Sequence, residues 1–295
     1  MQKLVYYAFR VLVAIMRITP LWLLYILADF IYIIFYYVLK YRKSVVYGNL
    51  SRSFPEKSEK EIDALAKKFY HHLADIFAES LKGLGIGKEE VIKRYSFKGT
   101  DLVHERIKQG KTVLLAGTHC GNWEWGALST PHYLEPDIYT LYKPLSNKYI
   151  DAYLKKQRAD QGMYMIPTTE TREIFQRKFE HPVAFILLSD QSPHNPRRAF
   201  WMNFLHQETG FLHGFEMQAR RYGHSVVFFR TTKIKRGYYQ IEFELITDTP
   251  KDYEPGMLTK EYAKRLEKLV LDDPAVWVWS HKRWRRQRPE GKPLL

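Results

Sequence analysis

The sequence contains very little cysteine: Cys120 is the single cysteine in 295 residues. One cysteine excludes an intramolecular disulfide and a cysteine-rich metal site, and it fits a protein of a reducing compartment. The chain also lacks a glycine-rich phosphate loop, an internal repeat and a low-complexity segment. Because no cofactor motif is present, no cofactor is expected.

Acidic residues are in deficit. Lys and Arg total 46 against 32 Asp and Glu, so the formal net charge is +14. Such a surplus attracts an anionic partner, which can be nucleic acid, an acidic membrane surface or a phosphorylated substrate. Nucleic acid is not expected, because the basic residues lie beside an apolar N-terminus and no nucleic-acid-binding motif is present. With 45% apolar residues, the length suits one large α/β domain, alone or with an appendage.

Residues 1–42 have a composition of their own. Leu21–Leu39 has 19 residues, which as a helix would extend about 28 Å, close to the ~30 Å hydrocarbon core of a bilayer. Asp29 makes a clean span costly, and Trp22 suits the membrane interface. No small-residue cleavage site follows. We therefore expect an uncleaved membrane anchor over residues 1–42, either spanning or interfacial; a buried hairpin of soluble helices is the alternative.

The most informative stretch combines a strand, a tight turn and a helix. Thr112–Ala116 is a short apolar run beside glycines, which predicts a strand buried on both faces. Asn122 is a favoured helix N-cap, so the turn brings His119 and Glu124 to the same place. A carboxylate beside an imidazole can orient the ring for general-base chemistry. A structural histidine in a polar turn is the alternative.

Further strands are expected beside this turn. Pro136–Lys143 reads as one strand, and Val183–Leu188 is a near-continuous apolar run that ends just before Asp190 and Gln191. Ligands of α/β sheets bind at the carboxyl ends of such strands. Tyr238–Ile246 alternates apolar and polar residues, which predicts an edge or half-exposed strand. Together the runs predict an α/β fold with a single mixed, largely parallel sheet flanked by helices.

A long helix is expected from Ser58 to Leu84, because its start has the pattern of a capping box. It carries His71, His72 and Asp75, which are metal-ligating residue types. Adjacent histidines on a helix point apart, so no metal site is expected there.

The C-terminal part is rich in tryptophan and basic residues. Asp273 and Pro274 have the types of an N-cap and a first helical residue, which predicts a helix there. The segment carries Trp277, Trp279 and Trp284. These indoles would either lie among anionic headgroups or pack into the core.

Several blocks resemble one family. Gly117-Thr-His-Cys-Gly-Asn-Trp-Glu124 is similar to the His-x4-Glu block of the late acyltransferases of lipid A biosynthesis, within the wider glycerolipid and lysophospholipid acyltransferase group. Tyr142-Lys-Pro-Leu-Ser-Asn147, Asp190-Gln191 and Pro274-x-x-Trp-x-Trp-x-His-x-Arg-Trp284 resemble further blocks, in the same order. Lys143 stands where the family usually has arginine, so the charge is kept and the two-pronged geometry is lost.

The resemblance implies a membrane-bound O-acyltransferase, with an anchor over residues 1–42 and an acyltransferase domain over residues 43–295. The domain would face the cytoplasm from the bacterial inner membrane. It would move a fatty acyl chain from an acyl-carrier-protein or coenzyme A thioester to a hydroxyl of a lipid A precursor. His119 would be the general base and Glu124 would hold its ring, with no metal. Substrate or oxyanion contacts are expected from Lys143, Arg158, Asp190 and Gln191, and from the backbone near Gly121 and Asn122.

Three alternatives stay open. Cys120, beside His119, could act as a thiol nucleophile. The same site could serve a lysophospholipid or amino-acid-lipid O-acyltransferase. Finally, a basic membrane-bound protein could bind anionic polymers without catalysis.

Overall fold

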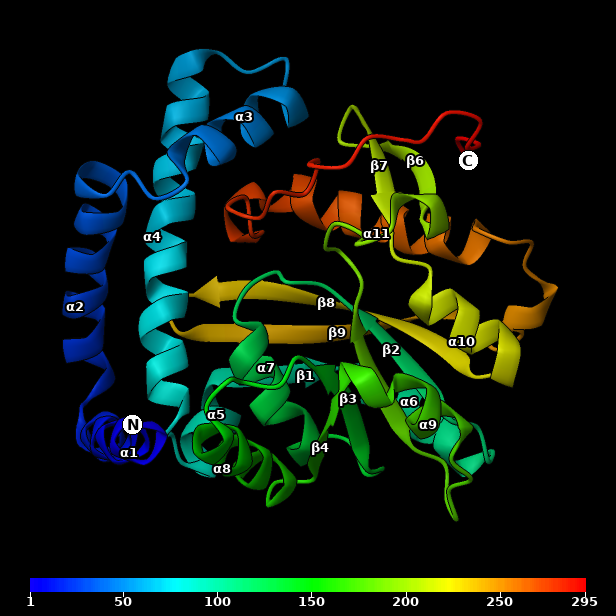
Figure 1. Ribbon diagram of the computed structural model, residues 1–295, viewed down its shortest axis with the longest axis horizontal. Coiled ribbons are helices and arrows are strands. Elements are labelled where there is room, and N and C mark those ends of the chain that lie inside the picture. Colours follow the sequence, from blue (N-terminus) through cyan, green and yellow to red (C-terminus); the bar gives the residue numbers. More distant parts are fainter.

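A computed structural model describes residues 1–295 and has helices on both sides of one large sheet (Figure 1). The helices are α1 (Gln2–Ile18), α2 (Leu21–Ile33), α3 (Lys43–Ser53), α4 (Glu59–Gly83), α5 (Lys88–Arg94), α6 (Thr100–Lys108), α7 (Trp123–Ser129), α8 (Lys148–Ala159), α9 (Thr171–Gln176), α10 (Gly214–Tyr222) and α11 (Met257–Asp272). The strands are β1 (Tyr95–Lys98), β2 (Val113–Gly117), β3 (Ile138–Tyr142), β4 (Met163–Pro167), β5 (Ala184–Leu188), β6 (Phe200–Phe204), β7 (Gln207–Phe211), β8 (Ser225–Lys235) and β9 (Tyr238–Thr247).

The large sheet has seven strands in the order β1-β9-β8-β2-β5-β3-β4. All neighbouring strands are parallel except β8 and β9, which form an antiparallel hairpin. Central strand β2 is buried on both faces: Leu114 and Ala116 join one hydrophobic cluster, whereas Val113 and Leu115 join the other. The predicted mixed, largely parallel sheet flanked by helices is therefore confirmed.

Strand β9 is not at the edge of the sheet. Its alternation is real, with Tyr239, Ile241 and Phe243 buried on one face, so the half-exposed prediction is confirmed. The edge prediction is wrong, because β1 pairs with the outer side of β9. At four residues, β1 is too short to leave a periodic signal in the sequence.

The N-terminal helices expose a continuous apolar surface. A π-helical segment, Ile34–Val38, extends α2, and Leu21–Val38 is long and apolar enough to cross a membrane by length and composition. Trp22 and Phe30 of α2 are exposed, as is Ile18 at the end of α1. Exposed apolar surface of this extent marks a contact with lipid or another protein.

The opposite face of α2 packs lengthwise on α4 (Figure 1). Tyr25 Oη donates to Glu79 of α4 at 2.8 Å, and Asp29 forms an ion pair with Arg236 at 2.6 Å. Asp29, which would be costly inside a bilayer, is thus paired against the rest of the fold. Helix α4 begins with the predicted capping box, because Ser58 and Glu61 bond to each other's backbone N–H groups.

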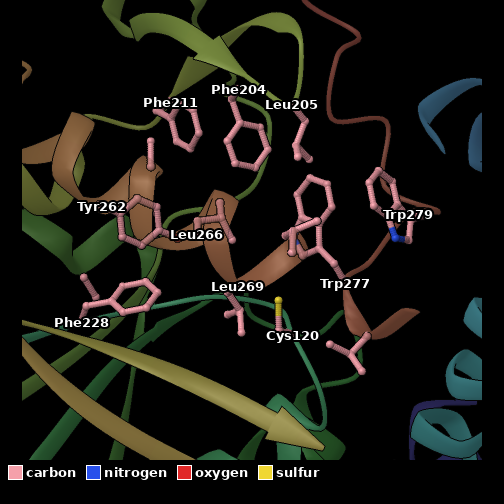
Figure 2. Packing of buried hydrophobic residues seen from close by; sticks show 14 of the residues in the cluster. Cys120, Phe204, Leu205, Phe211, Phe228, Tyr262, Leu266, Leu269, Trp277 and Trp279 are labelled. Atoms are coloured by element: carbon pink, nitrogen blue, oxygen red, sulfur yellow. The ribbon is translucent and has the colours of Figure 1, made fainter. Parts of the chain in front are cut away.

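The predicted C-terminal tryptophan-rich helix is wrong. Asp273 does accept from the Ala275 N–H, but only a single 3₁₀ turn, Pro274–Val276, follows. Beyond it Trp277 and Trp279 are buried in the main hydrophobic cluster (Figure 2). Tertiary bonds replace the helical ones: for example, the Asn49 amide donates to the Trp279 carbonyl at 2.9 Å. The two indoles are therefore core residues and not membrane contacts.

Candidate active site

The turn after β2 is held by its own backbone chemistry. Asn122 caps α7 by accepting from the Trp125 N–H at 2.9 Å, as predicted. Gly121 has φ of +60°, a left-handed conformation that favours glycine. Its N–H donates to the Val276 carbonyl at 3.1 Å, which ties the turn to the C-terminal segment. The turn thus places His119 at the carboxyl edge of the sheet.

His119 is held by Asp190, which follows the neighbouring strand β5. The Nδ1 atom of His119 lies 2.6 Å from Asp190 Oδ1, and its backbone N–H donates to Oδ2 at 2.8 Å. Trp277 Nε1 donates to the same Oδ2 at 2.9 Å. The sequence predicts a substrate contact for Asp190 and the ring contact for Glu124. In the structure the buried Asp190 makes the ring contact.

Opposing effects set the charge of this pair. Burial lowers the pKa of His119. The charge and hydrogen bond of Asp190 and the charge of Glu124 raise this pKa by more than burial lowers it, so the net shift is upward. Burial likewise raises the pKa of Asp190, whereas the His119 contacts and the Trp277 N–H lower it, and the net shift is downward. Asp190 is therefore ionised and favours a proton on His119 Nδ1.

The outer nitrogen of the ring faces Gln191. His119 Nε2 lies 3.2 Å from Gln191 Nε2. With the proton on Nδ1, Nε2 carries a lone pair that accepts from the Gln191 amide. Gln191 is exposed, so an exposed side chain covers this lone pair.

Glu124 pairs with Arg158 instead of the imidazole. Arg158 lies on α8, and its Nη2 donates to Glu124 Oε2 at 2.8 Å. The Arg158 side chain is 15% exposed and that of Glu124 is 43% exposed. Both side chains line the same pocket as His119, so the pair faces the space next to the imidazole.

The pocket has a volume of about 210 Å³ and is largely apolar, with 11 hydrophobic residues among the 18 that line it. Besides His119, Glu124 and Arg158 it includes Met163, Ile186, Phe229 and Ile241. Pockets for whole drug-sized ligands occupy ~300–1,000 Å³. This one therefore suits one apolar chain beside the imidazole rather than a complete lipid.

Besides Asp190 and Gln191, three predicted site residues do not line this pocket: Asn122, Gly121 and Lys143. Asn122 is fully buried, and its Nδ2 donates to Glu79 at 2.7 Å, so its side chain holds the turn. Gly121 has already committed its N–H to Val276. Lys143 is exposed directly after β3, whose last residues line the pocket.

Cys120 points away from the pocket. Figure 2 shows its sulfur directed into the hydrophobic cluster, towards Leu269 and Trp277. The thiol is fully buried, and burial raises its pKa well above the ordinary value. A thiol of this kind is a poor nucleophile, so the geometry gives no support to a covalent intermediate on Cys120.

The histidines of α4 do not face each other. His72 is buried with Nδ1 3.3 Å from the Lys233 ammonium, which also pairs with Asp75 at 3.3 Å. His71 stacks on Tyr32. Lys233 already supplies the positive charge beside Asp75, which disfavours a second cation there.

Comparison with known proteins identifies the family of the chain. No curated protein matches the chain. Over residues 1–286, however, the sequence matches the family described as bacterial lipid A biosynthesis acyltransferase, which confirms the resemblance of its sequence blocks. The chain therefore belongs to the bacterial lipid A biosynthesis acyltransferase family.

Proposed function

We propose that this lipid A acyltransferase moves a fatty acyl chain from a thioester donor to a hydroxyl of a lipid A precursor, with His119 as the general base. The observation that carries the proposal is the His119 ring, held by the buried carboxylate of Asp190 beside an apolar pocket. A base of this kind typically contributes ~10²–10⁴-fold to the rate.

The reaction needs no covalent intermediate. The acceptor hydroxyl replaces the Gln191 amide at His119 Nε2 and gives up its proton there as its oxygen attacks the thioester carbonyl. The tetrahedral oxyanion then collapses: the C–O bond remains, the C–S bond breaks, and the leaving thiolate takes the proton from Nε2. Asp190 stabilises the imidazolium between these two steps.

Arg158 is the donor that we assign to the oxyanion. It is the cation that lines the pocket with His119, whereas the Gly121 N–H is already bonded. Glu124 aims the guanidinium through their ion pair and adds negative charge near the imidazolium. Removing one oxyanion donor typically costs ~10²–10³-fold in kcat.

The substrates follow from the apolar pocket and the basic surface. The acyl chain lies in the pocket, and the net charge of +14 attracts a donor on acyl carrier protein or coenzyme A and a phosphorylated acceptor. Lys143, exposed beside the pocket, contacts the phosphorylated part of a substrate as a point charge.

The N-terminal helices fix the enzyme to the cytoplasmic face of the bacterial inner membrane. In this proposal residues 1–42 are the anchor and residues 43–295 the acyltransferase domain. Because α2 packs along α4 through Asp29 and Tyr25, it lies in the interface, with its exposed face in the lipid. Exposed lysines and arginines bind the anionic headgroups.

Purified protein in liposomes tests the proposal. Acyl-carrier-protein and coenzyme A thioesters are offered with a lipid A precursor, a lysophospholipid or an amino-acid lipid, and products are identified by mass spectrometry. We expect acylated lipid A precursor with wild type and none with His119→Ala. Acylation of the other lipids only would move the chain to a related acyltransferase activity. Binding of anionic polymers without turnover would mean a non-catalytic protein.

A further inference from the structure

A carboxylate outside the pocket is built into the support of the catalytic turn. Glu79 of α4 is fully buried and forms no ion pair, yet it accepts three side-chain hydrogen bonds. Its Oε2 accepts from Asn122 Nδ2 at 2.7 Å and from Tyr239 Oη at 2.8 Å, and its Oε1 accepts from Tyr25 Oη at 2.8 Å. Its backbone carbonyl accepts from Trp125 Nε1 at 2.8 Å.

A buried carboxylate is costly, and apolar residues of similar volume are commonly as good for stability. Burial raises the pKa of Glu79 to about 6, although the three hydrogen bonds act in the opposite direction. At neutral pH the group is therefore ionised and can accept from all three donors at once. The position needs an acceptor with two oxygens, which an apolar residue cannot supply.

The donors connect two distant parts of the protein. Asn122 and Trp125 belong to the catalytic turn and its helix α7, and the same Asn122 side chain caps α7. Helix α7 carries Glu124, which holds Arg158. Tyr25, which also donates to Glu79, lies on the inner face of α2, whose outer face is exposed and apolar.

We propose that Glu79 is a positioning residue for acyl transfer, which fixes the catalytic turn and ties it to the membrane-facing helix α2. The inference rests on the proposed function for its catalytic part. It follows that the position of α2 on α4, which depends on contact with lipid, affects the position of Asn122 and hence of the start of α7. Helix α2 is then a support of the active site as well as an anchor.

The single cysteine gives a direct probe of the turn. Cys120 is fully buried one residue before Gly121 and bridges to Trp277, so a maleimide reaches it only when the turn and the C-terminal segment separate. The labelling rate in liposomes needs no substrate, and failure of the proposed function would leave this measurement intact. Steady-state kcat and KM for the lipid acceptor form the second readout.

Glu216 provides a matched control. It is also a buried carboxylate with three hydrogen-bond donors, but these are the Gly256 and Thr259 N–H groups and the Thr259 hydroxyl, at the start of α11. Unlike Glu79, it also forms an ion pair, with Arg220 at 3.9 Å. Glu79→Gln should raise the labelling rate at least about tenfold, since buried donors lose their acceptor. Glu216→Gln, compared at equal stability in urea, should leave it within about twofold of wild type.

Activity separates positioning from a general structural role. Glu79→Gln should lower kcat by about 10²-fold, because a small misplacement of reacting groups has that effect. KM should stay within about twofold, since most of the residues that line the pocket lie outside α7. Equal labelling of Glu79→Gln and Glu216→Gln, or a raised KM with unchanged kcat, would overturn the proposal.

Tyr25→Phe tests the link to α2 and removes only one hydroxyl, so it keeps the test decisive if Glu79→Gln does not fold. Loss of one hydrogen bond should speed labelling by about two- to tenfold and lower kcat in the same direction. Tyr7→Phe, on the exposed face of α1, is its control. A Tyr25→Phe variant with the wild-type labelling rate and the wild-type kcat would contradict the proposed connection between α2 and the turn.

Discussion

The indole N–H of Trp277 donates to Asp190 Oδ2 at 2.9 Å, and the other oxygen of the same carboxylate lies 2.6 Å from His119 Nδ1. The C-terminal segment thus fixes the carboxylate that orients the His119 ring. Each oxygen of Asp190 has a defined donor, so the carboxylate cannot rotate without losing hydrogen bonds.

Trp277→Phe should weaken both the site and the fold. Phenylalanine keeps much of the buried ring but leaves one Asp190 lone pair unmatched, which costs about 1–3 kcal/mol. We expect a loss of kcat of about tenfold, since about 1.4 kcal/mol corresponds to a tenfold change in rate, together with a lower urea midpoint. Trp279→Phe, whose N–H donates to the Pro274 carbonyl, is the comparison. An equal loss of kcat in both variants would contradict the assigned role.

The pH dependence should follow the His119–Asp190 pair. Because the pKa of His119 is raised above 6.5, kcat/KM should increase with pH through a value above 6.5 as the ring loses its proton. Asp190→Asn removes the charge and hydrogen bond that raise the pKa of His119 most, whereas burial still lowers this pKa. The acidic limb of the kcat/KM profile should therefore move to lower pH. The plateau should fall about 10²–10⁴-fold. An unchanged limb in Asp190→Asn would mean that another group titrates.

The same pair makes stability depend on pH. Asp190 has a lowered pKa when folded, so its contribution is present above 3.8 and lost as pH falls through the folded value. His119 has a raised pKa, so its contribution is present below 6.5 and lost as pH rises through the folded value. Urea unfolding of wild type and Asp190→Asn should therefore differ most between these limits. A difference that grows steadily above pH 8 would contradict this sign.

Glu124 and Arg158 should behave as a unit. If Glu124 acts by aiming the guanidinium, Arg158→Gln should cost about 10²–10³-fold in kcat. Adding Glu124→Gln to Arg158→Gln should then cost much less than Glu124→Gln does alone. The four variants form a cycle that kcat measurements in liposomes complete. Fully additive losses would indicate that Glu124 has a separate catalytic role.

Gly121 should resist substitution for two reasons. Its φ of +60° disfavours any side chain by roughly 1–2 kcal/mol, and an added Cβ would lie 2.7 Å from Thr231 Cγ2. Gly110 has φ of +77° and nothing within 4 Å of an added Cβ. Gly121→Ala should therefore lower the free energy of unfolding by about 1–3 kcal/mol more than Gly110→Ala. Equal losses would mean that Thr231 moves away freely.

Local patterns predicted the parts of the site that lie close together in the chain. The apolar run of β2, the cap at Asn122 and the capping box at Ser58 are each set by a few neighbouring residues, and the structure has all of them. The family blocks identified the positions of Arg158 and Asp190, which the structure brings to the same edge of the sheet.

Contacts between distant residues were beyond such patterns. Asp190 and His119 are 71 residues apart, and their meeting depends on the pairing of β2 with β5, which no local signal encodes. Glu124 was the nearer carboxylate in sequence and was therefore expected at the ring. In the tail, Asp273 and Pro274 favour a helix, but Trp277 and Trp279 are both buried, and the Trp279 N–H donates to the Trp277 carbonyl at 2.9 Å, which is not a helical hydrogen bond.

Because Trp277 contacts Asp190 and Val276 accepts from Gly121, the site is assembled from residues that leave the ribosome at very different times. The hydrophobic helices of residues 1–42 can meet the bilayer during synthesis, long before residue 277 exists. Under the proposed anchoring and function, a nascent chain on the membrane lacks the hydrogen bond from Trp277 to Asp190, so we expect no acyl transfer until translation passes residue 277.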